Sequence, residues 1–373
     1  MIGMAIGVLA KYDYVGSFLR PQAIKAARAK FSAGQISEAD LHAVEDICIK
    51  KLVEAQKAAG YPLVTDGEYR RAYWHLDFMW GLNGVEEIEL EHGYQFHGEE
   101  TAPGSIQLVG KIDGHNHPFV NYFKYVNALA GDAKAKQTIP GPAQMLSELF
   151  RGKNGDNTRK YYPDMEDLIQ DIAKAYQTVI SELYDAGCRF LQLDDCTWGM
   201  IADKDYWEAK VGPGISIDAE AKKYLRLNNL ALEKVPVDMT IAMHVCRGNY
   251  NSTYAATGTY DIVGPYLFEH KRVNVFYLEY DDERAGTFDV LDNVPEDKEI
   301  VLGLITTKRP ELEDKDLIKA RIADAAKHVS LERLSLSPQC GFASCEIGNK
   351  ITEDVQWKKL ALVKEIAEEV WGE

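Results

Sequence analysis

The chain has 373 residues, enough for one α/β barrel with insertions or for two ordinary domains. Its formal net charge of −16 comes from 58 acidic and 42 basic residues, so its surface repels phosphate backbones and we expect no nucleic-acid partner. No apolar run approaches the roughly 20 residues that a membrane span needs, so no membrane partner is expected either. The six cysteines are scattered along a chain without a secretion signal. This pattern favours packing or metal binding over a disulfide framework and predicts a cytoplasmic protein.

The order of apolar and helical segments predicts the fold. Residues 1–10 are apolar but lack a basic flank and a small-residue cleavage site, so they are expected to form a strand or a docked arm. Eight short runs rich in Val, Ile, Leu and Phe are predicted as buried parallel strands: residues 12–18, 62–68, 136–141, 189–196, 238–248, 273–282, 299–308 and 331–342. Segments of helical period lie between them: residues 23–32, 37–59, 163–187, 217–232, 260–270, 314–329 and 351–371.

Eight strand–helix alternations predict a (β/α)8 TIM barrel, because parallel strands need helical crossovers, and we expect residues 1–373 to form one barrel domain. The alternative is an open doubly wound sheet, although no G-x-G-x-x-G follows the first run. Residues 85–132 alternate apolar and polar positions, which predicts an antiparallel hairpin insertion after the second strand. This insertion either covers the mouth of the barrel or forms an edge hairpin without a catalytic part.

Potential metal ligands follow three of the predicted strands. His244 and Cys246 are two residues apart on an extended chain and therefore point to the same face, while Glu279 and Cys340 end two further strands. In a barrel these strand ends meet at one rim. A histidine nitrogen, two sulfurs and a carboxylate oxygen suit tetrahedral zinc. The H-x-C pair alone is a weak signal, and a lone cysteine usually packs in a core; three converging strand ends make chance a poorer explanation.

Other predicted strand ends carry small or charged residues that could bind a substrate. They are Gly16 and Ser17, then Asp66 and Glu68 followed by Arg70 and Arg71, and finally Asp194 and Asp195. Carboxylates that converge on a pocket can hold a substrate ammonium, and a glycine lets a ligand approach the backbone closely. The alternatives for the carboxylates are helix caps and ion pairs with neighbouring arginines.

The motifs VGSF, TDGE, PGP, LQLDD, MHVC, YLEYDD, GLITTKRPELE and PQCG follow one another in this order along nearly the whole chain. In this set the chain resembles cobalamin-independent methionine synthase, and in particular short relatives equivalent to the catalytic C-terminal half of that enzyme. The resemblance implies a barrel with zinc held by His244, Cys246, Glu279 and Cys340. It also implies an amino-acid thiol whose ammonium is held by Glu68 and Asp194 and whose carboxylate is held by the backbone near Ser17.

The chain departs from the family pattern around the methyl donor. The tryptophan that stacks on the folate pterin aligns with Glu148, and the family's D-E-P-A-L-R-E-G becomes D-D-C-T-W-G, in which Trp198 offers another stacking face. The catalytic histidine of the family aligns with Lys308, and a lysine can protonate a leaving amine or bind a donor anion.

These features favour a zinc-dependent S-methyltransferase that acts on homocysteine or a close analogue to give methionine. The donor is expected to be 5-methyltetrahydrofolate or another methyl compound. Three alternatives stay open: a zinc enzyme that joins a thiol to another electrophile, like the epoxide-to-coenzyme M transferases; a metal-free barrel lyase or decarboxylase that uses Asp66 and Asp194; and a non-catalytic barrel with a structural zinc. A homo-oligomer is compatible with the sequence.

Overall fold

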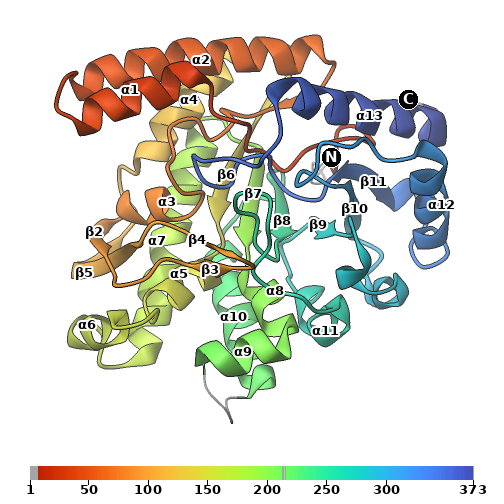
Figure 1. The fold of residues 1–373 in the computed structure, drawn as a ribbon. Coiled ribbons are helices and arrows are strands. Elements are labelled where there is room, and N and C mark those ends of the chain that lie inside the picture. The colour runs from red at the N-terminus through yellow and green to blue at the C-terminus, as the bar shows by residue number, and fades with distance from the viewer. Residues whose placement is uncertain (1–6, 212–213, 215, 373) are drawn as a thin grey trace.

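The computed structural model describes residues 7–211, 214 and 216–372, so most of the predicted N-terminal strand or arm lies outside the described residues. A curled parallel sheet of seven strands forms the centre of this part of the chain (Figure 1). In sheet order the strands are β1 (Leu63–Val64), β6 (Lys134–Pro140), β7 (Phe190–Asp195), β8 (Thr240–Val245), β9 (Val275–Glu279), β10 (Glu299–Ile305) and β11 (Leu334–Pro338). Every neighbouring pair in this sheet is parallel. The chain therefore has an α/β fold of the TIM-barrel-like kind.

Residues 12–18 were predicted as the first strand, and this prediction is wrong in the described structure. Tyr12 makes one isolated parallel bridge to Leu336 of β11, and the Asp13 N–H donates to the Leu336 carbonyl at 3.0 Å. Beyond this point the contacts are mixed: the Thr65 hydroxyl donates to the Gly16 carbonyl at 2.7 Å, and the Phe18 N–H donates to the Gly67 carbonyl at 3.0 Å. The run is thus extended between β11 and β1 without forming a regular ladder.

Long helices follow the strands, largely as predicted. They are α1 (Gln22–Ser32), α2 (Glu38–Ala58), α4 (Pro118–Ala130), α7 (Met165–Asp185), α10 (Ile217–Leu232), α12 (Lys315–Ala325) and α13 (Glu353–Trp371). Ser37 caps α2, and its side chain and that of Asp40 form a capping box. None of the helices in residues 7–211, 214 and 216–372 combines the length and apolarity needed to cross a membrane.

Shorter elements account for most of the differences from the sequence prediction. Those that the prediction lacks are α3 (Leu76–Trp80), α5 (Pro142–Glu148), α6 (Asn154–Tyr161), α8 (Thr197–Ala202), α9 (Lys204–Val211), η2 (Glu283–Ala285), η3 (Asp289–Asn293) and η4 (Leu331–Arg333). The helix predicted over residues 260–270 is instead η1 (Tyr260–Ile262) followed by α11 (Gly264–Leu267). Pro265 accounts for this break, since it cannot donate a backbone hydrogen bond to the preceding turn.

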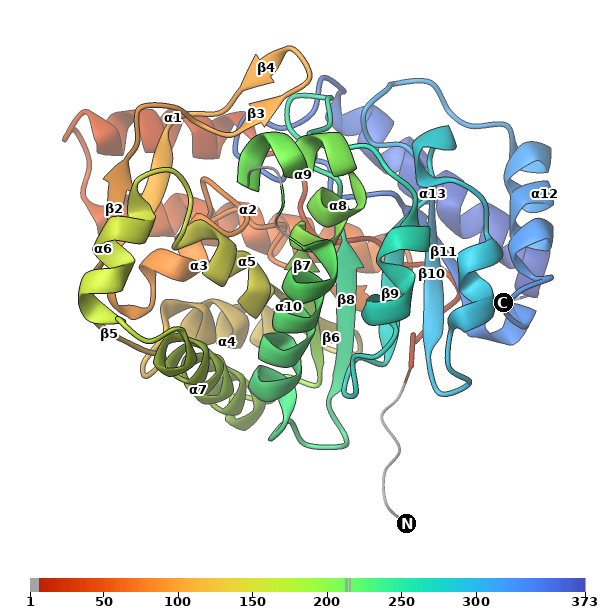
Figure 2. The same ribbon diagram turned by 90° about the horizontal axis from the view of Figure 1, so that it is seen from below.

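The predicted hairpin segment, residues 85–132, is longer than the antiparallel segment that the structure contains. Strands β2 (Asn83–Glu89) and β5 (Gly104–Asp113) pair in antiparallel fashion, and β3 (Gln95–Phe96) pairs with β4 (Glu99–Glu100) between them. Residues 118–130 form α4 instead, because the His117 side chain caps its first turn and Pro118 occupies the first helical position. Figure 2 shows β3 and β4 at the same end of the molecule as α8 and α9, the end toward which β8 points.

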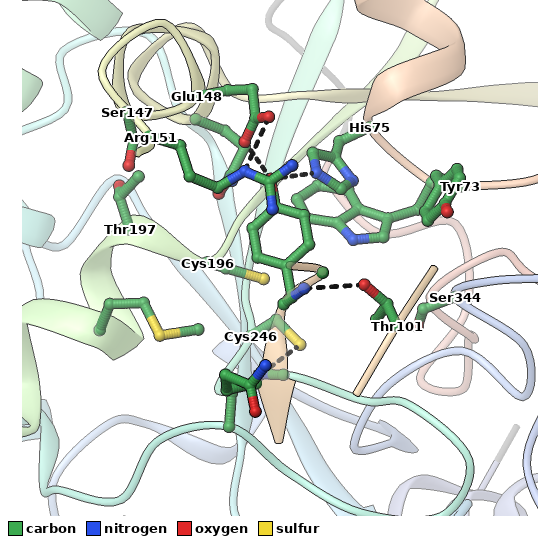
Figure 3. Close-up of a pocket in the computed structure, with 18 of the residues that line it drawn as sticks. Tyr73, His75, Thr101, Ser147, Glu148, Arg151, Cys196, Thr197, Cys246 and Ser344 are labelled. Atoms are coloured by element: carbon green, nitrogen blue, oxygen red, sulfur yellow. Dashed lines mark hydrogen bonds and ion pairs between the residues drawn. The ribbon is translucent and has the colours of Figure 1, made fainter. Parts of the chain in front are cut away.

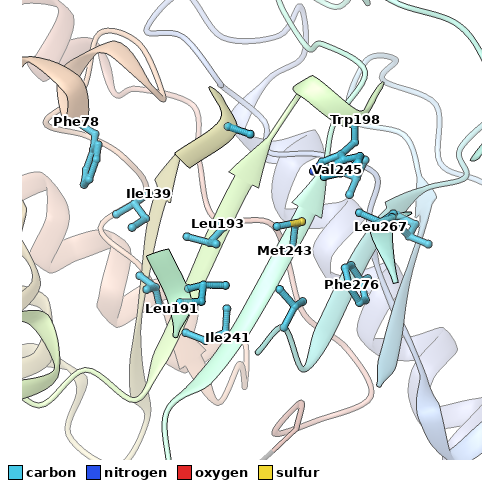
Figure 4. Close-up of a cluster of buried hydrophobic side chains, with 14 of the residues drawn as sticks. Phe78, Ile139, Leu191, Leu193, Trp198, Ile241, Met243, Val245, Leu267 and Phe276 are labelled. Carbon is cyan, nitrogen blue, oxygen red and sulfur yellow. The ribbon is translucent and has the colours of Figure 1, made fainter. Parts of the chain in front are cut away.

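Successive residues of each strand face opposite sides of the sheet, so one set packs in the core and the other faces the interior, where the site lies. Leu191, Leu193, Ile241 and Met243 point outward and pack beneath the surrounding helices (Figure 4). The residues between them face the interior of the curled sheet, where Val15, Ala242, Val275, Tyr277 and Val301 form a second apolar cluster. The side chains at the strand ends therefore project from a sheet that is closely packed on both faces.

Candidate metal centre and substrate pocket

Four potential metal ligands meet where three strands end. The ligand atoms of His244, Cys246, Glu279 and Cys340 all lie within 4.8 Å of one another, and all four residues are buried. His244 belongs to β8 and Glu279 ends β9, while Cys246 follows β8 directly and Cys340 follows β11. The structure therefore brings together every residue that the sequence predicted as a metal ligand.

The buried nitrogen and oxygen atoms of this cluster that lack a hydrogen-bond partner in the described chain are suitable zinc ligands. Neither ring nitrogen of His244 has a hydrogen-bond partner among the described residues, although the ring lies beside the Cys340 thiol. The same holds for Oε1 of Glu279, and buried polar atoms rarely stay without a partner. Two sulfurs bound to one zinc at about 2.3 Å and a tetrahedral angle lie about 3.8 Å apart. The Cys246 and Cys340 sulfurs are 3.7 Å apart.

Neighbouring backbone groups already hold two of the four ligands. The Gly248 N–H donates to Cys246 Sγ at 3.2 Å, and the Arg247 N–H donates to Glu279 Oε2 at 3.2 Å, which leaves Oε1 free. Contact with Cys246, together with burial, raises the pKa of the Cys340 thiol well above its usual value. A cation at the centre would reverse this effect, because a metal binds the thiolate and displaces the proton.

The cluster opens into a cavity of about 1040 Å³. His244, Cys246 and Cys340 line its floor, and the strand-end residues Val15, Ser17, Glu68 and Asp194 line it alongside them. Residues 89–96 of the antiparallel segment line the opposite side, together with residues of α5, α8 and α9. Figure 3 shows Glu148, Arg151 and His75 close together on one wall of this cavity. The cavity is large enough for an amino acid and a second, larger molecule.

Glu68 is held in the cavity wall by an unusual backbone. Its φ of 60° follows a φ of 66° at Gly67, and a non-glycine residue in this region marks a constrained position. Its Oε1 accepts from the Thr138 hydroxyl at 3.0 Å and lies 3.3 Å from the Arg71 guanidinium, while Oε2 has no hydrogen-bond partner within the described chain. Burial raises the pKa of Glu68, although Arg71 opposes this shift.

Asp194 is the second carboxyl of the cavity floor. Its Oδ1 accepts from Gln192 Nε2 at 2.8 Å. Burial, and then the charge of Glu68, raise the pKa of Asp194 well above its usual value. Burial raises the pKa of both carboxyls, and a cation placed between them would favour the charged form of each. The pair therefore suits a substrate ammonium.

Ser17 lies opposite the loop that carries Cys340. The Phe342 N–H donates to the Ser17 carbonyl at 3.0 Å. A side chain at position 341 would place its Cβ only 1.8 Å from Ser17 Oγ, so the close approach of the two segments requires Gly341. Gly16 does not line the cavity, although Val15 and Ser17 on either side of it do.

Asp195 and Trp198, both predicted as substrate ligands, point away from the cavity. Asp195 is fully buried, accepts from the Thr197 N–H at 2.9 Å and lies 3.3 Å from the Asn228 amide. Successive residues of a strand face opposite sides, so Asp195 must point outward when Asp194 points inward. Trp198 is also fully buried, with its ring against Tyr224 and His270. The stacking face expected from Trp198 is therefore occupied by the core.

Lys308 lies beside the metal cluster but does not line the cavity. Its Nζ is 3.7 Å from Asp281 Oδ2 and has no hydrogen-bond partner in the described structure. Burial lowers the pKa of Lys308, but the charges of Asp281 and Glu279 outweigh burial and raise it overall. The lysine is thus a fixed positive charge next to the ligand set.

Sequence reasoning missed a polar cluster on the far wall of the cavity. Buried Glu148 accepts from the Tyr94 hydroxyl, from the Ser105 hydroxyl at 2.5 Å and from Arg151 Nε at 2.9 Å. His75 Nε2 lies 2.9 Å from the same Tyr94 hydroxyl. No motif signals this cluster, because its members come from four distant segments. Hydrogen bonds from Tyr94 and Ser105 to Glu148 therefore connect the antiparallel segment to α5.

Comparison with known proteins identifies the family. Residues 12–367 match the model of the cobalamin-independent synthase catalytic domain. The chain belongs to this family. It is 44% identical over 360 residues to the uncharacterized protein YxjH of Bacillus subtilis, covering 96% of this chain and 94% of that protein. It is 24% identical to a methionine synthase of Saccharolobus islandicus over 88% of this chain and 86% of that protein.

Two solved structures are similar over almost their whole length. One, from Listeria monocytogenes and provisionally named a vitamin B12-independent methionine synthase, is 37% identical, with a TM-score of 0.77 and full coverage of both chains. The other is a B12-independent methionine synthase from Shewanella in complex with selenomethionine; it is 18% identical, with a TM-score of 0.74 and 98% coverage of both chains. The second likeness concerns the fold. Membership of the synthase family supports a methyltransferase role for this chain.

Proposed function

We propose that the protein is a zinc-dependent S-methyltransferase that converts homocysteine, or a close analogue, to methionine. The observation that carries the proposal is the convergence of His244, Cys246, Glu279 and Cys340, with ligand atoms within 4.8 Å of one another, at the floor of a large cavity. This donor set suits zinc. Because three of the four residues line the cavity, a substrate thiol can reach the same place.

Zinc at this centre would supply the Lewis acidity that keeps a substrate thiol deprotonated at neutral pH. Two cysteinates and one carboxylate carry three negative charges, which leaves the sulfur of the substrate electron-rich and nucleophilic. Lys308 holds a positive charge beside this anionic set, and we assign it that balancing role in place of the acid role expected from the sequence. Because Asp281 raises the pKa of Lys308, the ammonium keeps its proton and its positive charge throughout turnover.

The amino-acid end of the substrate is proposed to bind between Glu68, Asp194 and Ser17. Glu68 Oε2 is buried without a partner in the described chain, and a substrate ammonium would satisfy it. Such a site supports an amino-acid thiol over one that lacks an ammonium, such as coenzyme M. The selenomethionine bound by the Shewanella relative is an amino acid of the same kind.

The surrounding architecture belongs to the same proposal. Residues 12–18 would act as the eighth member of a closed (β/α)8 barrel, since they hydrogen-bond to β11 on one side and to the β1 end on the other. Residues 83–113 would be an insertion that covers the cavity, since residues 89–96 form one of its walls. The methyl donor, either 5-methyltetrahydrofolate or another methyl compound, would enter between this wall and α8–α9.

A donor screen tests the proposal. Zinc-loaded protein is incubated with homocysteine and one methyl donor at a time, and methionine is measured. The donors are mono- and polyglutamyl methyltetrahydrofolate, methylcobalamin and S-methyl compounds. Methionine should form with at least one donor, and Cys340→Ser should abolish it. Equal turnover by the metal-free protein would contradict the proposal.

A further inference from the structure

A third sulfur lies beside the metal cluster and takes no part in it. Cys196 lines the cavity and packs with Cys246 and Cys340 in a small cluster bordered by Trp74 and Met200. Its side chain packs against that of Cys246 in this cluster. Cys196 does not belong to the group whose ligand atoms all lie within 4.8 Å. The protein thus places an extra thiol against one proposed ligand.

The strand register explains why these two thiols meet. Asp194 pairs with His244 and Asp195 with Val245 in the parallel β7–β8 ladder, and Cys196 and Cys246 are the residues that directly follow these two strands. Neighbouring strands are about 4.8 Å apart. Helix α8 begins directly after Cys196 and lies close against the following backbone, where a Cβ at Gly199 would come within 2.3 Å of the Cys246 carbonyl oxygen.

This spacing is suitable for a disulfide bond. A disulfide joins residues whose Cα atoms are about 4.4–6.8 Å apart, and Cys196 and Cys246 directly follow two paired strand ends that lie about 4.8 Å apart. The alternative pair, Cys246 and Cys340, has its sulfurs 3.7 Å apart, but β9 and β10 lie between the two parent strands. Their backbones are not neighbours in the sheet. Cys196 is therefore the better partner for Cys246. Figure 3 shows both side chains at the cavity, where small molecules can reach them.

We propose that Cys196 and Cys246 form an oxidation site, at which a hydroperoxide converts the two thiols to a disulfide. The Cys246 sulfur attacks the peroxide oxygen, which breaks the O–O bond and gives a sulfenic acid and an alcohol, or water from hydrogen peroxide. The Cys196 sulfur then attacks the sulfenic sulfur and releases water. Two thiols and one hydroperoxide thus give one disulfide, one alcohol and one water, and the two electrons lost by sulfur reduce the peroxide.

Oxidation at this site would remove Cys246 from the ligand set. Three of the four donors would stay, so the metal would be held more weakly and released. A thiol reductant would restore both cysteines and the centre. This consequence rests on the proposed zinc site, whereas disulfide formation itself needs only the two thiols.

The test treats zinc-loaded and metal-free protein with hydrogen peroxide, blocks the remaining thiols and maps the peptides without reduction. The wild type should yield one linked pair that contains Cys196 and Cys246, and the loaded form should release its zinc to a chromogenic chelator until a reductant is added. Cys196→Ser should yield no linked pair, because the sulfenic acid formed at Cys246 then has no neighbouring Cys196 thiol to attack it. Cys345→Ser, which removes another thiol of the same cavity, should behave like the wild type.

Two results would overturn the inference. One is a linked pair of Cys246 with Cys340, and the other is full blocking of Cys196 after oxidation of the metal-free protein. The metal-free arm separates this inference from the proposed function. If no zinc binds at all, the proposed function fails, yet the disulfide can still form and be mapped. If zinc binds and no such disulfide appears, this inference fails alone.

Discussion

Replacing Asp194 with asparagine is expected to stabilise the substrate-free protein and to weaken its binding of methionine. The carboxyl is buried, and burial together with the charge of Glu68 raises its pKa well above the usual value. Asparagine keeps an oxygen that can accept the hydrogen bond from Gln192, which is 2.8 Å long. The substitution therefore removes a charge without removing this contact.

The sign of the stability effect follows from linkage. A folded-state pKa above the unfolded value means that the folded protein binds the proton more tightly, so stability falls as the pH rises between the two pKa values. Above this window the wild type bears the full cost, which is about 1.4 kcal/mol for each tenfold difference in proton affinity between the folded and unfolded states. Asp194→Asn should therefore raise the free energy of unfolding at pH values above the unfolded pKa of the aspartate. It should also flatten the decline of stability with rising pH.

Binding should change in the opposite direction. An ammonium about 4 Å from a carboxylate gains about 4 kcal/mol at an effective dielectric constant of about 20. After desolvation costs, losing this partner should cost about 3 kcal/mol, or a roughly 100-fold increase in the Kd of methionine. Urea unfolding at several pH values measures the first effect and titration calorimetry with methionine measures the second.

Asp195→Asn is the matched control, because the neighbouring carboxyl caps α8 and faces away from the cavity. It should leave methionine binding unchanged, since the asparagine oxygen can still accept from the Thr197 N–H and the side chain does not reach the substrate. The reasoning is refuted if Asp194→Asn binds methionine as tightly as the wild type, or if it destabilises the substrate-free protein at neutral pH.

Three further predictions concern the metal and the cavity wall. Cys340→Ser should keep the circular dichroism spectrum of the wild type but lose its zinc, because a hydroxyl is a much weaker zinc ligand than a thiolate. Lowering the pH should release zinc, since protons compete for the thiol and imidazole ligands, and a chelator-based titration follows this loss. Tyr94→Phe removes a donor to buried Glu148 and should cost about 1–3 kcal/mol in stability. It should also raise the KM of the methyl donor and leave methionine binding unchanged.

Each of these predictions has a control or a result that would contradict it. Cys48→Ser, on α2 and outside the cysteine cluster, should retain zinc. Release of zinc with rising rather than falling pH in the acid range would contradict the ligand assignment. A Tyr94→Phe variant that unfolds like the wild type would show that Glu148 does not depend on this hydroxyl.

The sequence predicted the convergence of the four potential metal ligands, because each stands at the end of a strand with a strong apolar signal. The pattern of β8 alone places His244 and Cys246 on one face, and the fold brings Glu279 and Cys340 beside them. The same alternation rule separates Asp194 from Asp195. Applied to LQLDD, it excludes Asp195 from the cavity, since both residues cannot face inward.

Tertiary contacts account for what the sequence could not predict. The apolar pattern of residues 12–18 predicts a strand, yet their backbone groups bind single backbone groups of several segments and side chains such as Thr65 instead of a regular ladder. Trp198 lies in the core because α8, a helix of six residues with no periodic signal of its own, packs against α10. The cluster around Glu148 joins four segments that are distant in the sequence, and local patterns carry no information about such contacts.

X-ray absorption at the zinc edge of the purified protein tests the central claim most directly. About one zinc per chain is expected, with two sulfurs at about 2.3 Å and two nitrogen or oxygen ligands at about 2.0–2.2 Å, from Cys246, Cys340, His244 and Glu279. Adding homocysteine should raise the sulfur count from two to three as the substrate thiol enters. A protein that is active without metal, or a zinc shell that homocysteine leaves unchanged, would contradict the account.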